Sequence, residues 1–222
     1  MPYARTLPNI EVSSRTPRKK RVVLRYIARF LLLFEKVKPQ GVFIDSKRTV
    51  VVGVPHQSSK DEYLMLLMVL ALDIDACYLS AKWTMRRLPN PFKKPVDIDD
   101  QGIRWPLGWL QEIFFKRLGA IPVDRKGNSG QFQSVIQELK KRDSFFLVIT
   151  PEGRFDSTRF RTSFLYIARE LNAEIMPIHL DYENKVYKFL PSFNYEGSEE
   201  EVVQRLRLIF DGVKGRYKRF KA

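Results

Sequence analysis

The expected architecture follows from residues 49–72. An apolar run, Thr49-Val-Val-Val-Gly-Val54, is followed by Pro55-His-Gln-Ser-Ser-Lys-Asp61 and then by apolar residues at helical spacing up to Leu72. The valine-rich run predicts a buried strand, and the spacing after it predicts a helix. A polar loop between two such elements is held by a rigid scaffold while its side chains face an open edge. The stretch therefore predicts a strand–loop–helix unit with a candidate site in the loop.

The loop contains His56 five residues before Asp61, which falls where the helix is expected to begin. If the loop folds back, the carboxylate accepts a proton from one ring nitrogen of His56 and leaves the other free to take a proton from a substrate hydroxyl. We therefore predict a general-base pair. The alternative is a histidine in a polar turn beside an N-cap aspartate, and spacing alone does not separate the two.

Composition narrows the class of protein. The 222 residues suit one α/β domain with a sizeable core, and 44% of them are hydrophobic. The 39 Lys and Arg against 25 Asp and Glu give a net charge of +14, which predicts an anionic partner such as a membrane surface, a phosphorylated substrate or nucleic acid. With one cysteine, Cys77, the chain forms no internal disulfide, and a reducing compartment is expected.

Three regions are expected along the chain. Residues 1–17 hold three prolines and predict a flexible tail, and residues 18–38 predict an amphipathic helix that opens with Arg18-Lys-Lys-Arg21. Residues 39–222 form the main domain. A basic cluster leading into a helix rich in Leu and Phe is typical of an interfacial membrane anchor. The alternative is a helix packed on the domain with its arginines in water.

The main domain alternates strand and helix patterns, which predicts an α/β fold, a single αβα sandwich with a mostly parallel central sheet. Residues 41–45 and 49–54 are expected to form a hairpin. Residues 86–104 contain three prolines and no periodicity, and they predict a long irregular connection. No apolar run reaches the roughly 18–20 residues that are needed to span a bilayer.

Three polar loops follow strands of this pattern. They are Pro55–Asp61, Val123-Asp-Arg125 and Thr150-Pro-Glu-Gly-Arg154. Ligands of open α/β sheets bind at the edge where strands end, so these loops are expected to form one site. Its two arginines suit a phosphate monoester, because their planar guanidiniums bind oxygens bidentately. No spacing typical of metal ligands is present.

These motifs resemble those of the glycerophospholipid acyltransferases, which include the lysophosphatidic acid acyltransferases. The family's His-x4-Asp is matched by His56 and Asp61, its Gly-x5-Arg by Gly119 to Arg125, and its Pro-Glu-Gly-Thr-Arg is approached by Pro151-Glu-Gly-Arg154. A strand with a central proline, Ile175-Met-Pro-Ile178, is similar to the fourth motif. The resemblance covers residues 42–191, and Ser80-Ala-Lys82 is similar to the segment between the first two motifs.

The chain departs from the family pattern in two places. The threonine expected after Gly153 is missing, so Arg154 arrives one position early, and Arg159 and Arg161 are possible substitutes. Residues 86–104 resemble an insertion without an assigned role.

The resemblance implies an enzyme that moves a fatty acyl group from a thioester to the hydroxyl of a lysophospholipid, foremost 1-acylglycerol-3-phosphate. It implies His56 as general base and Asp61 as its partner, with Arg125 and Arg154 on the acceptor phosphate. Backbone groups near Glu152 and Gly153, together with Lys82, are the candidate oxyanion donors.

No cofactor or metal is implied, and the co-substrate is acyl-CoA or an acyl carrier protein thioester. The expected location is the cytoplasm, in peripheral contact with an anionic membrane surface. Two alternatives remain. The first is a basic nucleic-acid-binding protein, supported by the charge and by the basic and aromatic tail Lys214–Lys221. The second is a catalytically inactive relative that binds lipid.

Overall fold

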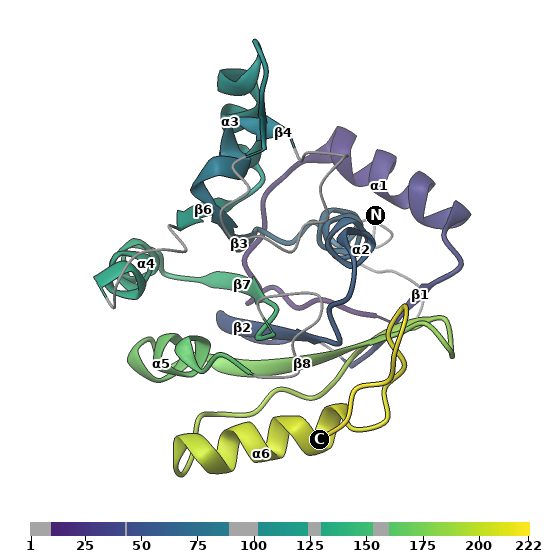
Figure 1. Ribbon diagram of the computed structural model, residues 1–222, viewed down its shortest axis with the longest axis vertical. Helices are drawn as coiled ribbons and strands as arrows, with labels where there is room; N and C mark the ends of the chain where they lie inside the picture. The colour runs from purple at the N-terminus through teal and green to yellow at the C-terminus, as the bar shows by residue number, and fades with distance from the viewer. Residues whose placement is uncertain (1–9, 43, 89–101, 124–129, 153–159) are drawn as a thin grey trace.

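A seven-stranded sheet forms the centre of the protein (Figure 1). The structure, a computed structural model, describes residues 10–42, 44–88, 102–123, 130–152 and 160–222. The strand order is β1-β9-β8-β2-β7-β3-β6, and every neighbouring pair is parallel except β8 and β9. The mostly parallel sheet expected from the alternating pattern is confirmed.

The elements follow in chain order. They are α1 (Val22–Phe34), β1 (Lys38–Gly41), β2 (Arg48–Val54), α2 (Ser59–Ala71), β3 (Ala76–Ala81), the 3₁₀ helix η2 (Lys82–Met85), β4 (Arg87–Leu88), β5 (Ile103–Arg104), α3 (Gly108–Arg117), β6 (Ala120–Val123), α4 (Gly130–Lys140), β7 (Phe145–Ile149), α5 (Ser163–Glu170), β8 (Glu174–Asp181), β9 (Val186–Phe189) and α6 (Glu199–Phe210).

Helices cover both faces of the sheet. On one face, α1 packs on α2, and Leu118 at the end of α3 lies in the same apolar cluster as Ala28 of α1 and Leu67 of α2. On the other face, α4, α5 and α6 bury apolar residues against the opposite side of β2, as Figure 1 shows. This arrangement is the expected αβα sandwich with the N-terminal helix first.

The predicted hairpin of residues 41–45 and 49–54 is wrong. β1 ends at Gly41 and pairs with β9 at the edge of the sheet, whereas β2 lies in its centre between β8 and β7. All residues of β2 after Arg48 are buried, as expected of a strand covered on both faces.

The N-terminal segment contacts the domain from residue 10 onward. Ile10 and Val12 are buried, and the hydroxyl of Thr16 donates to the carbonyl of Ile44 at 2.7 Å. These contacts attach the described part of the expected tail to the apolar cluster between the sheet and α2.

The arginines of α1 face the domain. The Arg29 guanidinium donates to the carbonyl of Ala71 at the C-terminal end of α2 (3.0 Å), and Arg25 lies 3.7 Å from the Asp73 carboxylate. Cations in this position satisfy terminal carbonyls and the helix dipole. The outer face of α1 is left apolar and exposed, and it consists of Val22, Val23, Tyr26, Ile27, Phe30, Leu33 and Phe34. Among the described residues, no helix is long and apolar enough to cross a bilayer.

Candidate functional site

Parallel strands bring the predicted site loops to one edge of the sheet. β2, β7, β3 and β6 are adjacent and run in the same direction, so the residues that follow them lie at a common edge. His56 follows β2, Glu152 follows β7 and Lys82 follows β3. Arg125, Gly153, Arg154 and Arg159 lie outside the described residues, so their predicted roles are not tested.

His56 and Asp61 lie side by side, as predicted. Nδ1 of His56 is 3.4 Å from Oδ2 of Asp61, and both side chains are buried. The separation is long for a hydrogen bond, but catalytic contacts often tighten only when substrate is bound. The contact fixes which ring nitrogen faces the carboxylate and leaves Nε2 on the other side.

Asp61 is held by four donors. Its Oδ2 accepts the backbone N–H groups of Gln57 (2.8 Å) and Ser58 (2.9 Å), which folds the loop over the first turn of α2. Its Oδ1 accepts the hydroxyls of Tyr182 (2.5 Å) and Tyr187 (3.0 Å). Burial alone would raise the pKa of Asp61, but contacts with His56, Tyr182 and these N–H groups lower it. The carboxylate is therefore anionic at neutral pH.

Glu62 faces the second nitrogen of the imidazole. Its Oε1 is 3.4 Å from Nε2 of His56, and its side chain is 67% exposed. Burial lowers the pKa of His56, but the hydrogen-bonding carboxylates of Asp61 and Glu62 more than offset it and raise the pKa to about 9. His56 thus lies between two carboxylates that favour its protonated form.

Glu152 links the loop after β7 to the loop after β2. Its buried carboxylate accepts the backbone N–H of His56 at 2.5 Å. Burial raises the pKa of Glu152 to about 7, although this hydrogen bond, the imidazolium and Lys218 all act to lower it. Glu152 therefore holds the His56 backbone, which is a positioning role that its place in the sequence did not reveal.

Lys82 begins η2 at the same edge with an exposed side chain. In the described part of the chain it makes no hydrogen bond or ion pair with His56, Asp61 or Glu152. Its role as an oxyanion donor stays a prediction. Arg161 is exposed, and its backbone N–H donates to the carbonyl of Pro151.

The basic C-terminal segment packs against the His56 loop. The side-chain oxygen of Gln57 accepts the backbone N–H groups of Tyr217 (2.8 Å) and Lys218 (3.0 Å), and its nitrogen donates to the carbonyl of Lys218 (2.9 Å). A Cβ at Gly215 would lie 2.7 Å from Gln57. The segment that suggested a nucleic-acid-binding tail is therefore a wall of the candidate site.

Several residues near the site were not predicted. Tyr182 directly follows β8 and Tyr187 lies in β9, both more than 120 residues after Asp61, and no local pattern connects them. Glu62 is adjacent to Asp61, and helical geometry beside the loop could have indicated it. Within the described residues, no group of three or more His, Cys, Asp and Glu side chains is placed to hold a metal ion.

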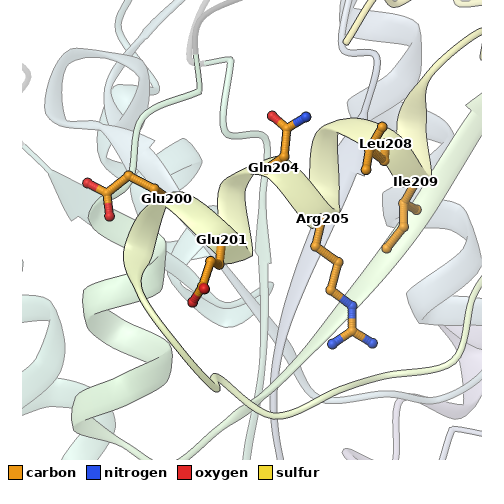
Figure 2. Close-up of a pocket in the computed structure, with 6 residues that line it drawn as sticks. All are labelled: Glu200, Glu201, Gln204, Arg205, Leu208 and Ile209. Carbon is orange, nitrogen blue, oxygen red and sulfur yellow. The ribbon is translucent and has the colours of Figure 1, made fainter.

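Three other features have no contact with the His56–Asp61 pair. The pocket in Figure 2 is lined along α6 alone, by Glu200, Glu201, Gln204, Arg205, Leu208 and Ile209. Nε2 of His179 in β8 lies 2.8 Å from the carbonyl oxygen of Ile209 in α6, a contact typical of a structural histidine. Cys77 is buried, and burial raises its pKa to about 12, so it is a core residue.

Comparison with known proteins found two similarities. Residues 102–181 match the family model described as Acyltransferase, a region that includes Gly119 and Glu152 but not His56 or Asp61. The crystal structure of the 1-acyl-sn-glycerophosphate (LPA) acyltransferase PlsC from Thermotoga maritima is similar, with a TM-score of 0.51 and 16% identity over 84% of this chain and 75% of that chain. No curated protein sequence matches. Residues 102–181 are therefore similar to the Acyltransferase family, and the chain shares its fold with the Thermotoga maritima protein.

Proposed function

We propose that the protein transfers a fatty acyl group from an acyl thioester to the free hydroxyl of a lysophospholipid, foremost 1-acylglycerol-3-phosphate. The observation that supports this most is the buried His56–Asp61 pair, joined through Glu152 to the loop after β7. The Thermotoga maritima protein, which has a similar fold, is an LPA acyltransferase. Acyl-CoA and an acyl carrier protein thioester are the two candidate donors.

The proposed reaction uses the imidazole twice. Neutral His56 takes the proton of the acceptor hydroxyl at Nε2 while that oxygen attacks the thioester carbonyl. Asp61 keeps Nδ1 protonated and stabilises the imidazolium that forms. The tetrahedral intermediate then collapses to the ester, the C–S bond breaks, and the thiolate takes the proton from His56. No covalent acyl-enzyme is needed.

The remaining roles extend the proposal to the substrate. Arg125 and Arg154 bind the acceptor phosphate, and backbone groups near Glu152 and Gly153, with Lys82, stabilise the oxyanion. The exposed apolar face of α1 rests on the anionic membrane in which the lipid resides, on the cytoplasmic side. The Lys60–Glu35 ion pair (2.8 Å) supports this placement, because it joins the end of α1 to the first turn of α2, next to His56.

The test is acyl transfer by the purified protein to radiolabelled lysophosphatidic acid in liposomes, with acyl-CoA and acyl carrier protein donors in separate reactions. A monoacylglycerol of the same chain length serves as the acceptor without phosphate. We expect labelled phosphatidic acid and little diacylglycerol. Transfer to neither acceptor with either donor would contradict the proposal. Liposome binding without transfer would then favour a catalytically inactive relative that binds lipid. A shift of nucleic acid in a gel would instead favour a nucleic-acid-binding protein.

A further inference from the structure

α3 exposes an apolar face that the proposed function does not use. Its large apolar residues at 109, 110, 113 and 114 are spaced i, i+1, i+4 and i+5, so they lie on one side of the helix, and Leu107 precedes them. All are at least 42% exposed: Leu107, Trp109, Leu110, Ile113 and Phe114. The small antiparallel pair of β4 and β5 adds exposed Leu88 and Ile103.

The opposite side of α3 fixes the helix on the domain. The side-chain amide of Gln111 donates to the carbonyls of Thr84 (2.7 Å) and Arg87 (3.0 Å), and a Cβ at Gly108 would lie 2.4 Å from the carbonyl of Arg86. With its polar and small residues turned inward, α3 cannot bury the apolar face by a simple rotation. The exposed face is therefore a fixed feature of the fold.

α1 and α3 belong to the same layer. The guanidinium of Arg21, at the start of α1, donates to the carbonyl of Arg117 at the end of α3 (3.1 Å). Leu118 packs in the cluster that holds Ala28 of α1. Figure 1 shows both helices on the same side of the sheet. Two helices with exposed apolar faces are thus joined to each other on one side of the sheet.

This layer extends to the edge that carries the candidate site. The end of α1 is joined to the first turn of α2 by the Lys60–Glu35 pair. The start of α3 is held on η2, which follows directly from β3 at that edge. α1 therefore ends beside the loop that contains His56, and α3 begins at the same edge of the sheet.

Charge indicates the occupant of the α3 face. Exposed Arg86, Arg104, Lys116 and Arg117 border it, and the one acidic side chain described in η2, β4, β5 and α3, Glu112, is paired with Arg86 and with Lys116. Apolar side chains that include a tryptophan, bordered by cations, suit the interface of an anionic bilayer.

We infer that α3 is a second membrane-docking element, and that α1 and α3 together form a two-helix surface for an anionic lipid bilayer. The inference rests on the proposed function in that the acceptor is a membrane lipid. Docking through two helices fixes the orientation of the protein on the bilayer, whereas one helix leaves it free to roll. The candidate site is thereby held at the lipid surface.

The test measures vesicle binding, which does not depend on acyl transfer. The full chain is sedimented with vesicles of equal parts phosphatidylglycerol and phosphatidylcholine, and with phosphatidylcholine alone. Trp109→Glu with Phe114→Glu places charges on α3, Phe30→Glu places one on α1, and Leu208→Glu is the matched control on exposed α6. We expect the α3 variant to lose about tenfold or more in partitioning to anionic vesicles, and the control to bind as the wild type does.

A second measurement locates Trp109 directly. In a Trp83→Phe, Trp105→Phe variant, Trp109 is the sole tryptophan, and brominated phospholipid should quench its emission. Full binding by the α3 variant while Phe30→Glu abolishes it would overturn the inference and leave α1 as the only docking helix. Trp109 emission that brominated phospholipid does not quench would also overturn the inference. So would a dimer, seen in sedimentation equilibrium, that the α3 variant disrupts, because the α3 face would then be an interface between copies of the protein. Acyl transfer that continues in these cases leaves the proposed function standing.

Discussion

The backbone N–H of His56 donates to the buried carboxylate of Glu152 at 2.5 Å, and this contact couples two loops that are 96 residues apart in the sequence. The position of the His56 imidazole depends on the position of its backbone, which this hydrogen bond holds. Loss of the acceptor would leave a buried N–H without a partner, which costs about 1–3 kcal/mol.

Substitution of Glu152 tests this positioning role. Glu152→Gln keeps an acceptor oxygen, so we expect it to retain most of the stability and turnover, whereas Glu152→Ala removes the acceptor and should lower kcat more than KM rises. Urea unfolding and steady-state kinetics of the two variants measure this. Equal losses of stability and turnover in the two variants would mean that Glu152 acts through its negative charge and not through the hydrogen bond to His56.

The Glu62–His56 contact predicts a pH effect. The proposed base must be neutral, and the resting pKa of about 9 means that transfer should increase as pH rises toward that value. Glu62→Gln removes an anion beside Nε2, which lowers the pKa of His56 and should shift the rising limb of the pH–rate profile to lower pH by on the order of one unit. Transfer at neutral pH should therefore increase.

The control for this effect is Glu138→Gln, which removes a surface carboxylate from α4, where it pairs with Lys141 and Arg142. Its profile should match the wild type. If the rising limb of the pH–rate profile stays at the same pH in Glu62→Gln, Glu62 does not act on the proton-accepting nitrogen.

The hydroxyl of Tyr187 donates to Asp61 inside the apolar core. Tyr187→Phe should destabilise the protein by about 1–3 kcal/mol, as expected for a buried hydrogen bond to a charged group. It should also reduce kcat severalfold, because Asp61 then holds the imidazole less firmly. Tyr195→Phe, on the other side of the sheet, removes a hydroxyl without either effect. Denaturation and kinetics of both variants provide the measurement, and unchanged kcat in Tyr187→Phe would contradict the role.

Gly119, the first residue of the Gly-x5-Arg spacing, has a packing role in this structure. Gly119 has φ +98°, and a Cβ there would lie 2.0 Å from the carbonyl of Ala76. Gly212 has φ +76°, and a Cβ there would have no heavy atom within 4 Å. A substitution at Gly212 therefore measures the cost of the positive φ alone, without a steric clash. We expect Gly212→Ala to cost about 1 kcal/mol and Gly119→Ala clearly more, measured by thermal unfolding. Similar costs would mean that the close approach relaxes freely.

Local patterns predicted most elements because β2 and β7 are short apolar runs and the helices have clear periodicity. They also placed Asp61 at the start of α2, where it folds the loop onto itself. The hairpin prediction failed because strand pairing is a long-range property: β1 is adjacent to β2 in sequence but pairs with β9. The same reason hid Tyr182 and Tyr187, which are distant from Asp61 in sequence and are brought to it because β8 pairs with β2.

The proposed base is tested most directly by acyl transfer to radiolabelled lysophosphatidic acid with the wild type and His56→Ala, both checked for folding by circular dichroism. Removal of a general base should lower kcat by at least about a hundredfold. His179→Ala, at a histidine that contacts α6 instead, should leave transfer largely intact. Equal transfer by wild type and His56→Ala would contradict the account, because the proposed reaction has His56 as its only base.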